Sequence, residues 1–462
     1  MDRVVIVGAG PVGVTAAILL AQRGVPSLLL DRYPDPYPLP RAVHVDDEVM
    51  RILQAAGVAE DFGKVSRPGL GLRLLDARHR VMAEFRRDAA AGPHGYPQAN
   101  MFDQPDLERL LRARMSALPL IEFIGGASVF AVTSSSVSYH PPAGGPPLTV
   151  PAAAVLGCDG ANSTVRSLIG SSLLDLRFAE RWLVVDGECP SELSAWGGVH
   201  QVCDPRRAAT FMQLGPRRYR WEFRLLEGES DLEVEPLLAP WLRSVPVRIL
   251  RRAEYTFRAN VASSWRSGRV FLLGDAAHQT PPFVGQGLGA GLRDAYNLAW
   301  KLATDLTTPG GASELLASYE RERVPHVRAQ IRLAKLAGWA MTGGQDRAAA
   351  VRRIVLGAVW RLPGLKGLAL RSTSPALRGV GRGRLAGTLA PQPSPRLDEA
   401  LGDGWAMLYT GAQPPGLPGH RLVHVTDELD PAGSLRRWMR GRTVILRPDR
   451  VVAATRRLTE ER

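Results

Sequence analysis

The feature that most constrains the fold is a glycine-rich turn between a buried strand and a helix near the N-terminus. The turn reads Val-Gly-Ala-Gly-Pro-Val-Gly and runs from Val7 to Gly13, directly after the apolar run Val4–Val7. The residues after Gly13 have a helical pattern, and a second apolar run, Ser27–Leu30, ends at Asp31. This β-α-β order builds a parallel sheet. The sequence therefore predicts an α/β fold.

The glycines of this turn fit the fingerprint of a dinucleotide site. In that fingerprint they permit a tight turn, the close approach of a pyrophosphate and the packing of helix against strand. The helix N-terminus adds amide donors for the phosphates. Asp31 follows at the spacing of the carboxylate that accepts hydrogen bonds from an adenosine ribose. The alternative is a glycine-rich turn without a ligand. The residues expected to bind the ADP part of a cofactor are Gly8, Gly10, Pro11, Gly13, Asp31 and Arg32.

A second glycine-bearing stretch, Gly274–Gly287, follows the buried strand Arg269–Leu273. Ligands bind at the carboxyl edge of such strands, where a carboxylate holds a ribityl or ribose hydroxyl. The proline- and glycine-rich loop that follows is suited to lie against a flat ring, and the next helix would stabilise the negative charge of a reduced flavin. The pair of stretches predicts one flavin and redox chemistry, against the alternative of a plain strand-turn-helix junction. The expected contacts are Gly274, Asp275, Pro282, Gly285, Gln286 and Gly287.

Between these stretches lies an Asp-Gly pair, Asp159-Gly160, after a third apolar strand and shortly before Arg166. Asp-Gly turns are common without any function. The residues alone leave open whether this is a third approach to the cofactor or an ordinary turn.

The remaining patterns predict two further units. The texture of 178–258, rich in β-branched, aromatic and turn residues, predicts an antiparallel-sheet substrate lobe inserted into a cofactor domain formed by 1–177 and 259–385, with part of 68–100 joining the lobe. A small α/β appendage, 396–462, follows a proline-spaced linker. Long helices are expected over 289–306, 312–341 and 348–370.

The composition excludes some classes of protein. The net charge of +13 comes almost entirely from arginines, which are dispersed and form no recognisable nucleic-acid motif. Cys158, Cys189 and Cys203 form neither a CxxC pair nor a zinc-like set. No apolar run is long enough to cross a membrane. We therefore expect a cytoplasmic protein without nucleic-acid, membrane or metal partners, as a monomer or homodimer.

Along the chain the three motifs follow one another as Val7–Gly13, Asp159-Gly160 and Gly274–Gly287. In this order they resemble the motifs of the FAD-dependent aromatic monooxygenases of the p-hydroxybenzoate hydroxylase type. Within that group the chain is most similar to the 3-(3-hydroxyphenyl)propionate hydroxylases and the polyketide aromatic hydroxylases. The resemblance covers nearly the whole chain. Its further motifs are Pro40–His44, Gln104–Glu108, Cys203–Arg207, Trp221–Phe223 and Gly291–Ala295.

The resemblance implies a Rossmann-like FAD-binding domain, a β-sheet substrate lobe and a thioredoxin-like tail without redox cysteines. Arg41 and Gln104 would contact FAD, Asp159 and Gly160 would serve FAD and the nicotinamide donor, and Arg166 would support that segment. NAD(P)H would bind transiently, without its own Rossmann fold. The tail departs from the family pattern Arg-Pro-Asp-Gly, because it reads Arg-Pro-Asp-Arg at 447–450.

The family mechanism implies that NAD(P)H reduces FAD, that O2 adds to give a flavin C4a-hydroperoxide, and that its terminal oxygen is transferred to an electron-rich ring carbon. A base that deprotonates a phenol would assist. We select His44 because it lies next to a segment expected to contact FAD. The other candidates are His94, His200, Tyr219 and Tyr255. For the arginines 217, 218 and 220 two alternatives stay open: one of them meets an acidic or phenolate substrate, and most of them are solvated, because alternate positions of a strand face opposite sides.

Several alternatives stay open within this fold. Epoxidation, Baeyer-Villiger oxidation and quinone formation are not separable from hydroxylation by sequence, whereas the Trp-x-Trp motif of flavin halogenases is absent. A flavin- or nucleic-acid-binding regulator without turnover is a more remote alternative. A polycyclic molecule and a small phenolic acid both stay open as substrates, and the arginine-rich composition slightly favours the polycyclic molecule.

Overall fold

The N-terminal β-α-β unit forms as the sequence predicts. The computed structural model describes residues 3–36, 42–204, 206–342 and 374–457. In it, β1 (Val4–Val7) leads through α1 (Pro11–Ala21) to β2 (Ser27–Asp31). Both strands are almost entirely buried, as expected for parallel strands that are covered on both faces.

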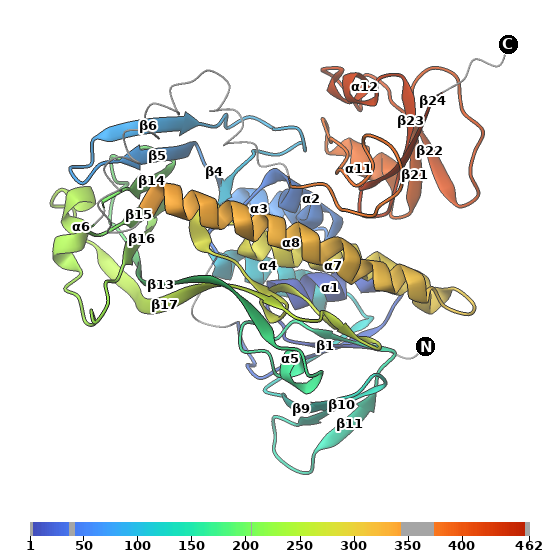
Figure 1. Ribbon diagram of the computed structural model, residues 1–462, viewed down its shortest axis with the longest axis horizontal. Coiled ribbons are helices and arrows are strands. Elements are labelled where there is room, and N and C mark those ends of the chain that lie inside the picture. Colours follow the sequence, from blue (N-terminus) through green and yellow to red (C-terminus); the bar gives the residue numbers. More distant parts are fainter. Residues whose placement is uncertain (1–2, 37–41, 205, 343–373, 458–462) are drawn as a thin grey trace.

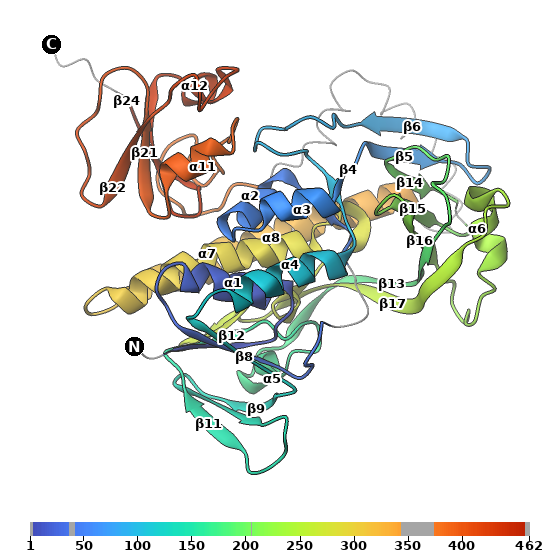
Figure 2. The ribbon, with the colours of Figure 1, turned by 180° about the vertical axis from the view of Figure 1, so that it is seen from behind.

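These strands belong to a six-stranded sheet in which only β18, at one edge, is antiparallel to its neighbour. Helices α1, α4 (Gln104–Ser116) and α7 (Gly287–Thr307) lie on one face, and a three-stranded sheet lies beyond the other (Figures 1 and 2). The strand order is β18 (Arg266–Ser267), β19 (Val270–Leu272), β12 (Ala154–Gly157), β1, β2 and β8 (Ile121–Gly125). The three-stranded sheet has the order β11 (Leu148–Pro151), β10 (Ser136–His140) and β9 (Ser128–Val132).

Helix α7 packs tightly along α1 because small residues face the contact. A Cβ atom added at Gly291 would lie 2.6 Å from Val12 Cγ2 and 3.0 Å from Gly274 Cα. The long helix α8 (Ser313–Thr342) runs beside α7 (Figure 1). The helix expected over 348–370 lies outside the described residues. The shorter helices of this part are α2 (Asp47–Ala55), α3 (Ala59–Val65), α5 (Thr164–Leu168) and the 3₁₀ turns η1 (Gly274–Ala276) and η2 (Pro282–Val284).

Two long antiparallel strands carry the chain into the predicted substrate lobe. β13 (Leu173–Glu188) and β17 (Arg248–Ala262) pair along most of their length and form part of an eight-stranded sheet. The predicted boundaries at 177/178 and 258/259 therefore fall inside strands. At the first of them the register shifts between Asp175 and Ala179, where Arg177 has φ +57°. A bulge of this kind bends a strand without ending it. The division into domains stays a prediction.

The eight-stranded sheet also takes in strands from the 68–100 region, as expected. Its other members come from the lobe, apart from the short β20 next to β17. A short helix, α6 (Glu235–Leu242), covers its outer face (Figure 1). The order is β20 (His278–Gln279), β17, β13, β16 (Arg218–Arg224), β15 (Ala209–Gln213), β14 (Val199–Val202), β5 (Gly71–Leu75) and β6 (Val81–Arg86). Three short strands, β3 (His44–Val45), β7 (Asn100–Met101) and β4 (Arg67–Pro68), form a separate small sheet.

The C-terminal unit is a four-stranded mixed sheet that stands beside α2 and α7 (Figure 1). β21 and β22 are parallel, and β23 is antiparallel to both of its neighbours, as in a thioredoxin-like sheet. These sheets and their helices confirm the predicted α/β fold class. The elements are α11 (Arg396–Leu401), β21 (Trp405–Tyr409), β22 (His420–His424), α12 (Ser434–Met439), β23 (Arg442–Leu446) and β24 (Val452–Arg457).

The segment 389–395 is not the free linker that its prolines suggested. Ala390 N donates to Arg450 O at 3.1 Å and Gln392 N donates to Pro93 O at 2.8 Å. Ala390 and Gln392 are fully buried. Prolines at alternate positions keep the chain extended and leave the intervening N–H groups free to donate. The segment therefore ties the C-terminal unit to the rest of the molecule.

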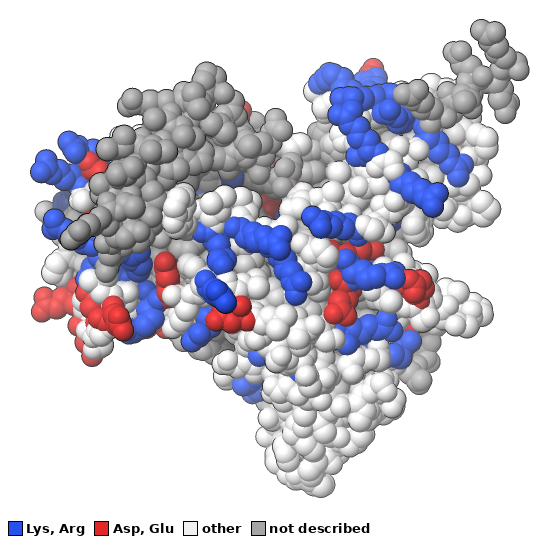
Figure 3. All heavy atoms as spheres, viewed as in Figure 1, with Lys and Arg blue, Asp and Glu red and all other residues white. Residues whose placement is uncertain are grey.

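The surface shows no single charged field on the face in Figure 3. Basic side chains are frequent on the C-terminal unit, acidic ones lie among them elsewhere, and the tip formed by β9–β11 is almost uncharged. Within the described ranges, no helix is long and apolar enough to cross a membrane. No group of three or more His, Cys, Asp or Glu side chains there is arranged to hold a metal ion.

Candidate cofactor and substrate site

The first glycine turn has one open and two filled positions. A Cβ at Gly8, where φ is +106°, would lie 2.4 Å from Cys158 O, and a Cβ at Gly13 would lie 2.0 Å from Gly8 O. Gly10, the residue before α1, has no atom within 4 Å of such a Cβ. Pro11 occupies the first turn of the helix. Gly8 and Gly13 thus serve the packing, whereas Gly10 leaves room beside the helix N-terminus.

Asp31 supports this turn from the next strand. Its Oδ2 accepts a hydrogen bond from Ala9 N at 2.6 Å, and its Oδ1 accepts one from Tyr33 N at 2.8 Å. A carboxylate accepts about four hydrogen bonds in total. Asp31 is partly exposed and can therefore still accept bonds from a ribose. Arg32 is exposed, with its guanidinium 6.0 Å from the ring centre of Tyr33.

The second glycine stretch starts from a buried clamp. Gly274 N donates to Asp294 Oδ2 at 3.0 Å, His278 Nε2 lies 2.7 Å from the same oxygen, and Arg323 Nε donates to Asp294 Oδ1 at 2.7 Å. Burial alone would raise the pKa of Asp294, but Arg323 and His278 outweigh it and hold the pKa below its usual range. The clamp fixes η1 and presents Asp275, which is only partly buried.

The Asp159-Gly160 turn is joined to both glycine stretches. Gly8 packs against Cys158 and Asp159, while Arg166 donates to Ala276 O and to Ala161 O, each at 2.9 Å. Asp159 accepts from Ser163 Oγ and from Val165 N at the start of α5. The three motifs that the sequence singled out therefore meet at the carboxyl edge of the six-stranded sheet.

The loop after β20 contacts His44 and the N-terminal end of α2. Gly285 has φ +61°, and a Cβ there would lie 2.9 Å from His44 Nδ1. Pro282 opens η2, whose Phe283 ring packs edge-on against Trp182 of β13 at 6.1 Å. Gly287 begins α7 with no atom within 4 Å of an added Cβ.

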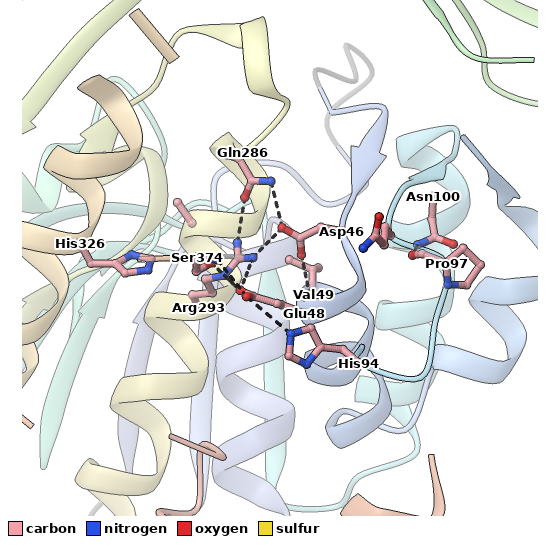
Figure 4. A network of polar contacts seen from close by, with 12 residues as sticks. Asp46, Glu48, Val49, His94, Pro97, Asn100, Gln286, Arg293, His326 and Ser374 are labelled. Atoms are coloured by element: carbon pink, nitrogen blue, oxygen red, sulfur yellow. Dashed lines mark hydrogen bonds and ion pairs between the residues drawn. The ribbon is translucent and has the colours of Figure 1, made fainter. Parts of the chain in front are cut away.

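The Gln286 side chain points away from this loop into a buried ion-pair network (Figure 4). Its Nε2 donates to Asp46 Oδ2 at 2.9 Å, and its Oε1 accepts from Arg293 Nη1 at 3.1 Å. Arg293 also donates to Asp46 Oδ2 at 2.6 Å and to Glu48 Oε2 at 2.8 Å. Gln286 therefore braces the loop rather than meeting a ligand with its side chain.

The expected base, His44, is the candidate that adjoins the loop. Burial, and then the charge of Arg87, lower its pKa to about 4, so the ring is neutral near pH 7. His94 lies beside Arg51, Tyr219 O–H donates to Pro216 O, and Tyr255 accepts from Arg251. His200 stacks on Trp196, on the outer face of the lobe.

Gln104 acts on the chain next to the site. It begins α4, its Oε1 accepts from Ala42 N at 2.7 Å, and its Nε2 donates to Glu108 Oε1 at 2.7 Å. It holds the segment that leads to His44. Arg41, expected to contact FAD, lies outside the described residues.

One face of the lobe sheet is directed at these loops. The sequence did not predict that the polar side chains on this face are buried. Tyr219, Trp221 and Phe223 pack in the outer core with α6, so the alternate residues of β16 face inward. Arg218 donates to Asp103 Oδ2 at 2.6 Å. Arg220, expected to be solvated, is only 1 % exposed. It donates to both oxygens of Asp186, at 2.6 and 3.0 Å.

Comparisons with known proteins identify the family to which this chain belongs. The family model described as "FAD binding domain" matches residues 1–334. The chain belongs to this family. A probable NADH-specific resorcinol 4-hydroxylase of Rhodococcus jostii (strain RHA1) is 36% identical, over 89% of this chain and 79% of that protein. A 3-(3-hydroxy-phenyl)propionate/3-hydroxycinnamic acid hydroxylase of Mycobacterium sp. (strain KMS) is 31% identical, over 97% of this chain and 87% of that protein.

The solved structures agree. An anhydrotetracycline hydroxylase of Streptomyces rimosus superposes with a TM-score of 0.75 at 25% identity, over 98% of this chain and 95% of that one. The chain is therefore an FAD-dependent aromatic monooxygenase that uses FAD, NAD(P)H and O2.

The residues of this enzyme fit FAD. Gly10, Gly160 and Gly287 lie on separate turns, and a Cβ at each would meet no atom within 4 Å. Gly8 and Gly13 near Gly10, and Gly291 inside α7, are by contrast tightly packed. Two helix N-termini, those of α1 and α7, start at this edge and favour negative charge. Cys158 lies beside Gly13, and burial raises the pKa of its thiol well above the ordinary value, so it stays protonated.

Proposed function

We propose that the enzyme hydroxylates a phenolic ring of a small aromatic molecule. FAD would lie along the carboxyl edge of the six-stranded sheet, and the substrate would lie between that edge and the inner face of the lobe. The observation that carries this proposal is the junction of the three cofactor motifs opposite a buried, polar sheet face. The similar proteins named for resorcinol and for hydroxyphenylpropionate support a phenolic substrate.

In this proposal each cofactor motif has a separate task. The α1 N-terminus would bind the pyrophosphate, Asp31 the ribose of the ADP part, Asp275 the ribityl chain and the α7 N-terminus the flavin ring. Gln104, Arg166 and Gln286 would support the neighbouring backbone, because their side chains are engaged by the protein. The proposed direct contacts are Gly8, Gly10, Pro11, Gly13, Asp31, Arg32, Asp159, Gly160, Gly274, Asp275, Pro282, Gly285 and Gly287.

Bound FAD supplies the redox chemistry that couples NAD(P)H oxidation to the use of O2. The chain supplies binding, orientation and a dry site. Burial of the inner face, with Arg220 and Asp186 paired to each other, keeps this wall polar without admitting bulk water. We take NADH as the reductant, after the relative at 36% identity.

His44 would accept the proton of the phenol that is activated. It lies against the Gly285 loop, and its low pKa keeps the ring neutral above pH about 5, so that one of its two nitrogens is free to accept a proton. A general base of this kind contributes about 10²- to 10⁴-fold to a rate. Cytoplasmic location and a monomeric or homodimeric state stay predictions from the sequence.

The experiment that tests this function uses the purified, FAD-reconstituted enzyme. A set of phenols is screened for those that accelerate flavin reduction by NADH. The products are then analysed by mass spectrometry for the addition of one oxygen atom. We expect at least one phenol to stimulate reduction and to gain one oxygen. A protein that stays colourless after incubation with FAD would contradict the proposal.

A further inference from the structure

One acidic side chain on the inner face of the lobe has no partner among the described residues. Glu222 lies on β16, and across the sheet it pairs with Val184 of β13 and Thr210 of β15. It is 8 % exposed. Among the residues that the structure describes, none forms a hydrogen bond or an ion pair with its carboxyl group.

The arginines around Glu222 are all engaged elsewhere. Along β16, Arg220 is bound by both oxygens of Asp186, and Arg224 Nη1 donates to Thr342 O at 3.2 Å. Asp186 also accepts from Arg251 Nε at 2.8 Å. Asp186 thus accepts three hydrogen bonds from arginines, whereas Glu222, which lies next to it on the same face, accepts none from the described residues.

This face is directed at the cofactor edge and not at bulk water. Trp182, opposite Arg224, packs against Phe283 in the loop between β20 and α7. We call this loop the flavin loop, because the flavin ring is proposed to lie against it. Met212, opposite Arg220, clusters with Met101 of β7. Glu222 lies in the row between these two contacts, facing the same loops as they do.

Glu222 is a buried residue whose carboxyl group receives no hydrogen bond from the described residues, and such a group calls for an explanation. Burial raises the pKa of Glu222, with Asp186 adding to the rise and with Arg220 and Arg251 opposing it. Hydrophobic residues would stabilise this position better. A carboxyl group that is kept at such a cost at a substrate face is best explained by a ligand that supplies the missing donor.

We propose that Glu222 determines substrate specificity by accepting a hydrogen bond from a hydroxyl group of the aromatic substrate. The inference rests on the proposed function and adds the class of substrate to it. Because the arginines beside Glu222 are already paired, this wall accepts hydroxyl donors and disfavours a carboxylate. The substrate class is therefore an uncharged ring with a hydroxyl beyond the one that is activated, rather than a phenol with an acidic side chain.

The test compares two ligands and three proteins. The ligands are 1,3-dihydroxybenzene and 3-(3-hydroxyphenyl)propionate, and the proteins are the wild-type holoenzyme, Glu222→Gln and Glu254→Gln. Glu254 is a matched control, because it lies on β17 of the same sheet and pairs with Arg181 at the surface. Dissociation constants are measured by calorimetry on the oxidised holoenzyme, without turnover.

We expect the wild type to bind the diol at least about ten-fold more tightly than the carboxylate, as one hydrogen bond to a charged group allows. Glu222→Gln weakens diol binding by about ten-fold and closes most of this gap, whereas Glu254→Gln behaves as wild type. The melting temperature of Glu222→Gln does not fall, because no partner in the protein is lost. A role in folding alone would lower it.

Three results would overturn the proposal. The wild type prefers the carboxylate, or it binds neither ligand, or the Glu222→Gln variant keeps the wild-type selectivity. Flavin reduction by NADH is measured on the same samples and tests the proposed function independently of the role of Glu222. If phenols stimulate reduction while Glu222→Gln keeps the wild-type selectivity, only the assignment of Glu222 fails.

Discussion

At the scale of residues, the glycines of the cofactor motifs divide into those that permit packing and those that leave room. Gly13 belongs to the first kind and Gly10 to the second. Gly10 has φ −72°, which any residue adopts, so its lack of a side chain is not required by the backbone. The fingerprint alone does not separate these two roles.

This division gives a paired prediction. Gly10→Ala leaves the unfolding free energy of the apoprotein within about 0.5 kcal/mol of wild type, but weakens FAD binding by about ten-fold or more. Gly13→Ala places a Cβ 2.0 Å from Gly8 O, and this overpacking costs about 1–3 kcal/mol or more. Thermal unfolding of the apoproteins and titration with FAD check both. A large loss of stability in Gly10→Ala would contradict the assignment.

His44 and His200 form a second pair at this scale. The pKa of each is lowered to about 4, first by burial, but only His44 adjoins the flavin loop. His44→Asn is expected to lower kcat by about 10²-fold or more with little change in KM, and to remove the dependence of kcat on pH near 4 to 5. His200→Asn keeps wild-type kinetics. Equal losses in both variants would show a general effect of burial.

At the scale of elements, the N-terminal end of α2 carries three consecutive acids with different states. Asp46 caps the helix by accepting from Val49 N at 2.8 Å and pairs with Arg293, which also binds Glu48. Among the residues that the structure describes, none forms a hydrogen bond with Asp47 Oδ2. Burial, followed by the charges of Asp46 and Glu48, raises the pKa of Asp47 to about 8.

The sign of the pH effect at Asp47 follows from this shift. The folded protein holds a proton on Asp47 up to pH about 8, whereas the unfolded chain loses it near 4. Folding is therefore progressively penalised as the pH rises from 4 to 8. Asp47→Asn removes the penalty and should raise the unfolding free energy by about 1–3 kcal/mol at pH 8 and by almost nothing at pH 4. Denaturant unfolding at both values checks it, and a loss of stability at pH 8 would contradict it.

Arg293 joins α7 to α2 and to the flavin loop. Arg293→Lys keeps the charge but loses the fork that binds Asp46, Glu48 and Gln286 together. We expect the unfolding free energy to fall by about 1–3 kcal/mol and FAD affinity to fall with it, because Gln286 loses its brace. Arg321→Lys, in an exposed pair with Glu314, is the control and should change neither. Unchanged FAD affinity in Arg293→Lys would show that the brace is dispensable.

At the scale of the whole molecule, the C-terminal unit is held by buried ion pairs. Arg51 of α2 and Arg450 both bind Asp398 of α11, and Arg447 binds Glu322 of α8. Arg450 has φ +63°, in the region that favours glycine. This is the position where the sequence departs from the Arg-Pro-Asp-Gly that the resemblance implied. Arginine at this position adopts a backbone conformation that glycine reaches more readily, and its side chain holds the turn by binding Asp398.

Breaking this anchor tests the attachment. Asp398→Asn leaves Arg51 and Arg450 without their counter-charge, which costs about 3–5 kcal/mol for a buried pair. Glu428→Gln, in an exposed pair with Arg396, costs almost nothing. Calorimetric unfolding of both variants checks the difference. An unchanged melting temperature in Asp398→Asn would mean that the unit is not docked in solution.

The sequence predicted the parts of the site that rest on local patterns. The strand Val4–Val7, the helix after it and the position of Asp31 follow from periodicity and spacing, and the structure confirms these elements. The functional roles of the glycines and of Asp31 stay predictions. The long helices α7 and α8 also follow from their apolar periodicity.

The features that the sequence did not predict depend on which distant segment covers each face of a strand or loop. The alternation in Arg218–Arg224 is typical of a strand with one face in water, and it led to the expectation that most of the arginines 217, 218 and 220 are solvated. Only the tertiary fold places the cofactor domain over that polar face and buries Arg220 and Glu222. The direction of the Gln286 side chain and the packing of 389–395 are likewise set by distant segments.

The central claim is that this chain inserts one atom of O2 into a phenol at the expense of NADH. The most direct test supplies ¹⁸O2 to the FAD-loaded enzyme with NADH and 1,3-dihydroxybenzene, and measures the label in the product against the NADH consumed. We expect one labelled oxygen per product molecule and close to one NADH oxidised for each. Product that carries oxygen from water, or NADH oxidation that yields only hydrogen peroxide with every phenol offered, would contradict it.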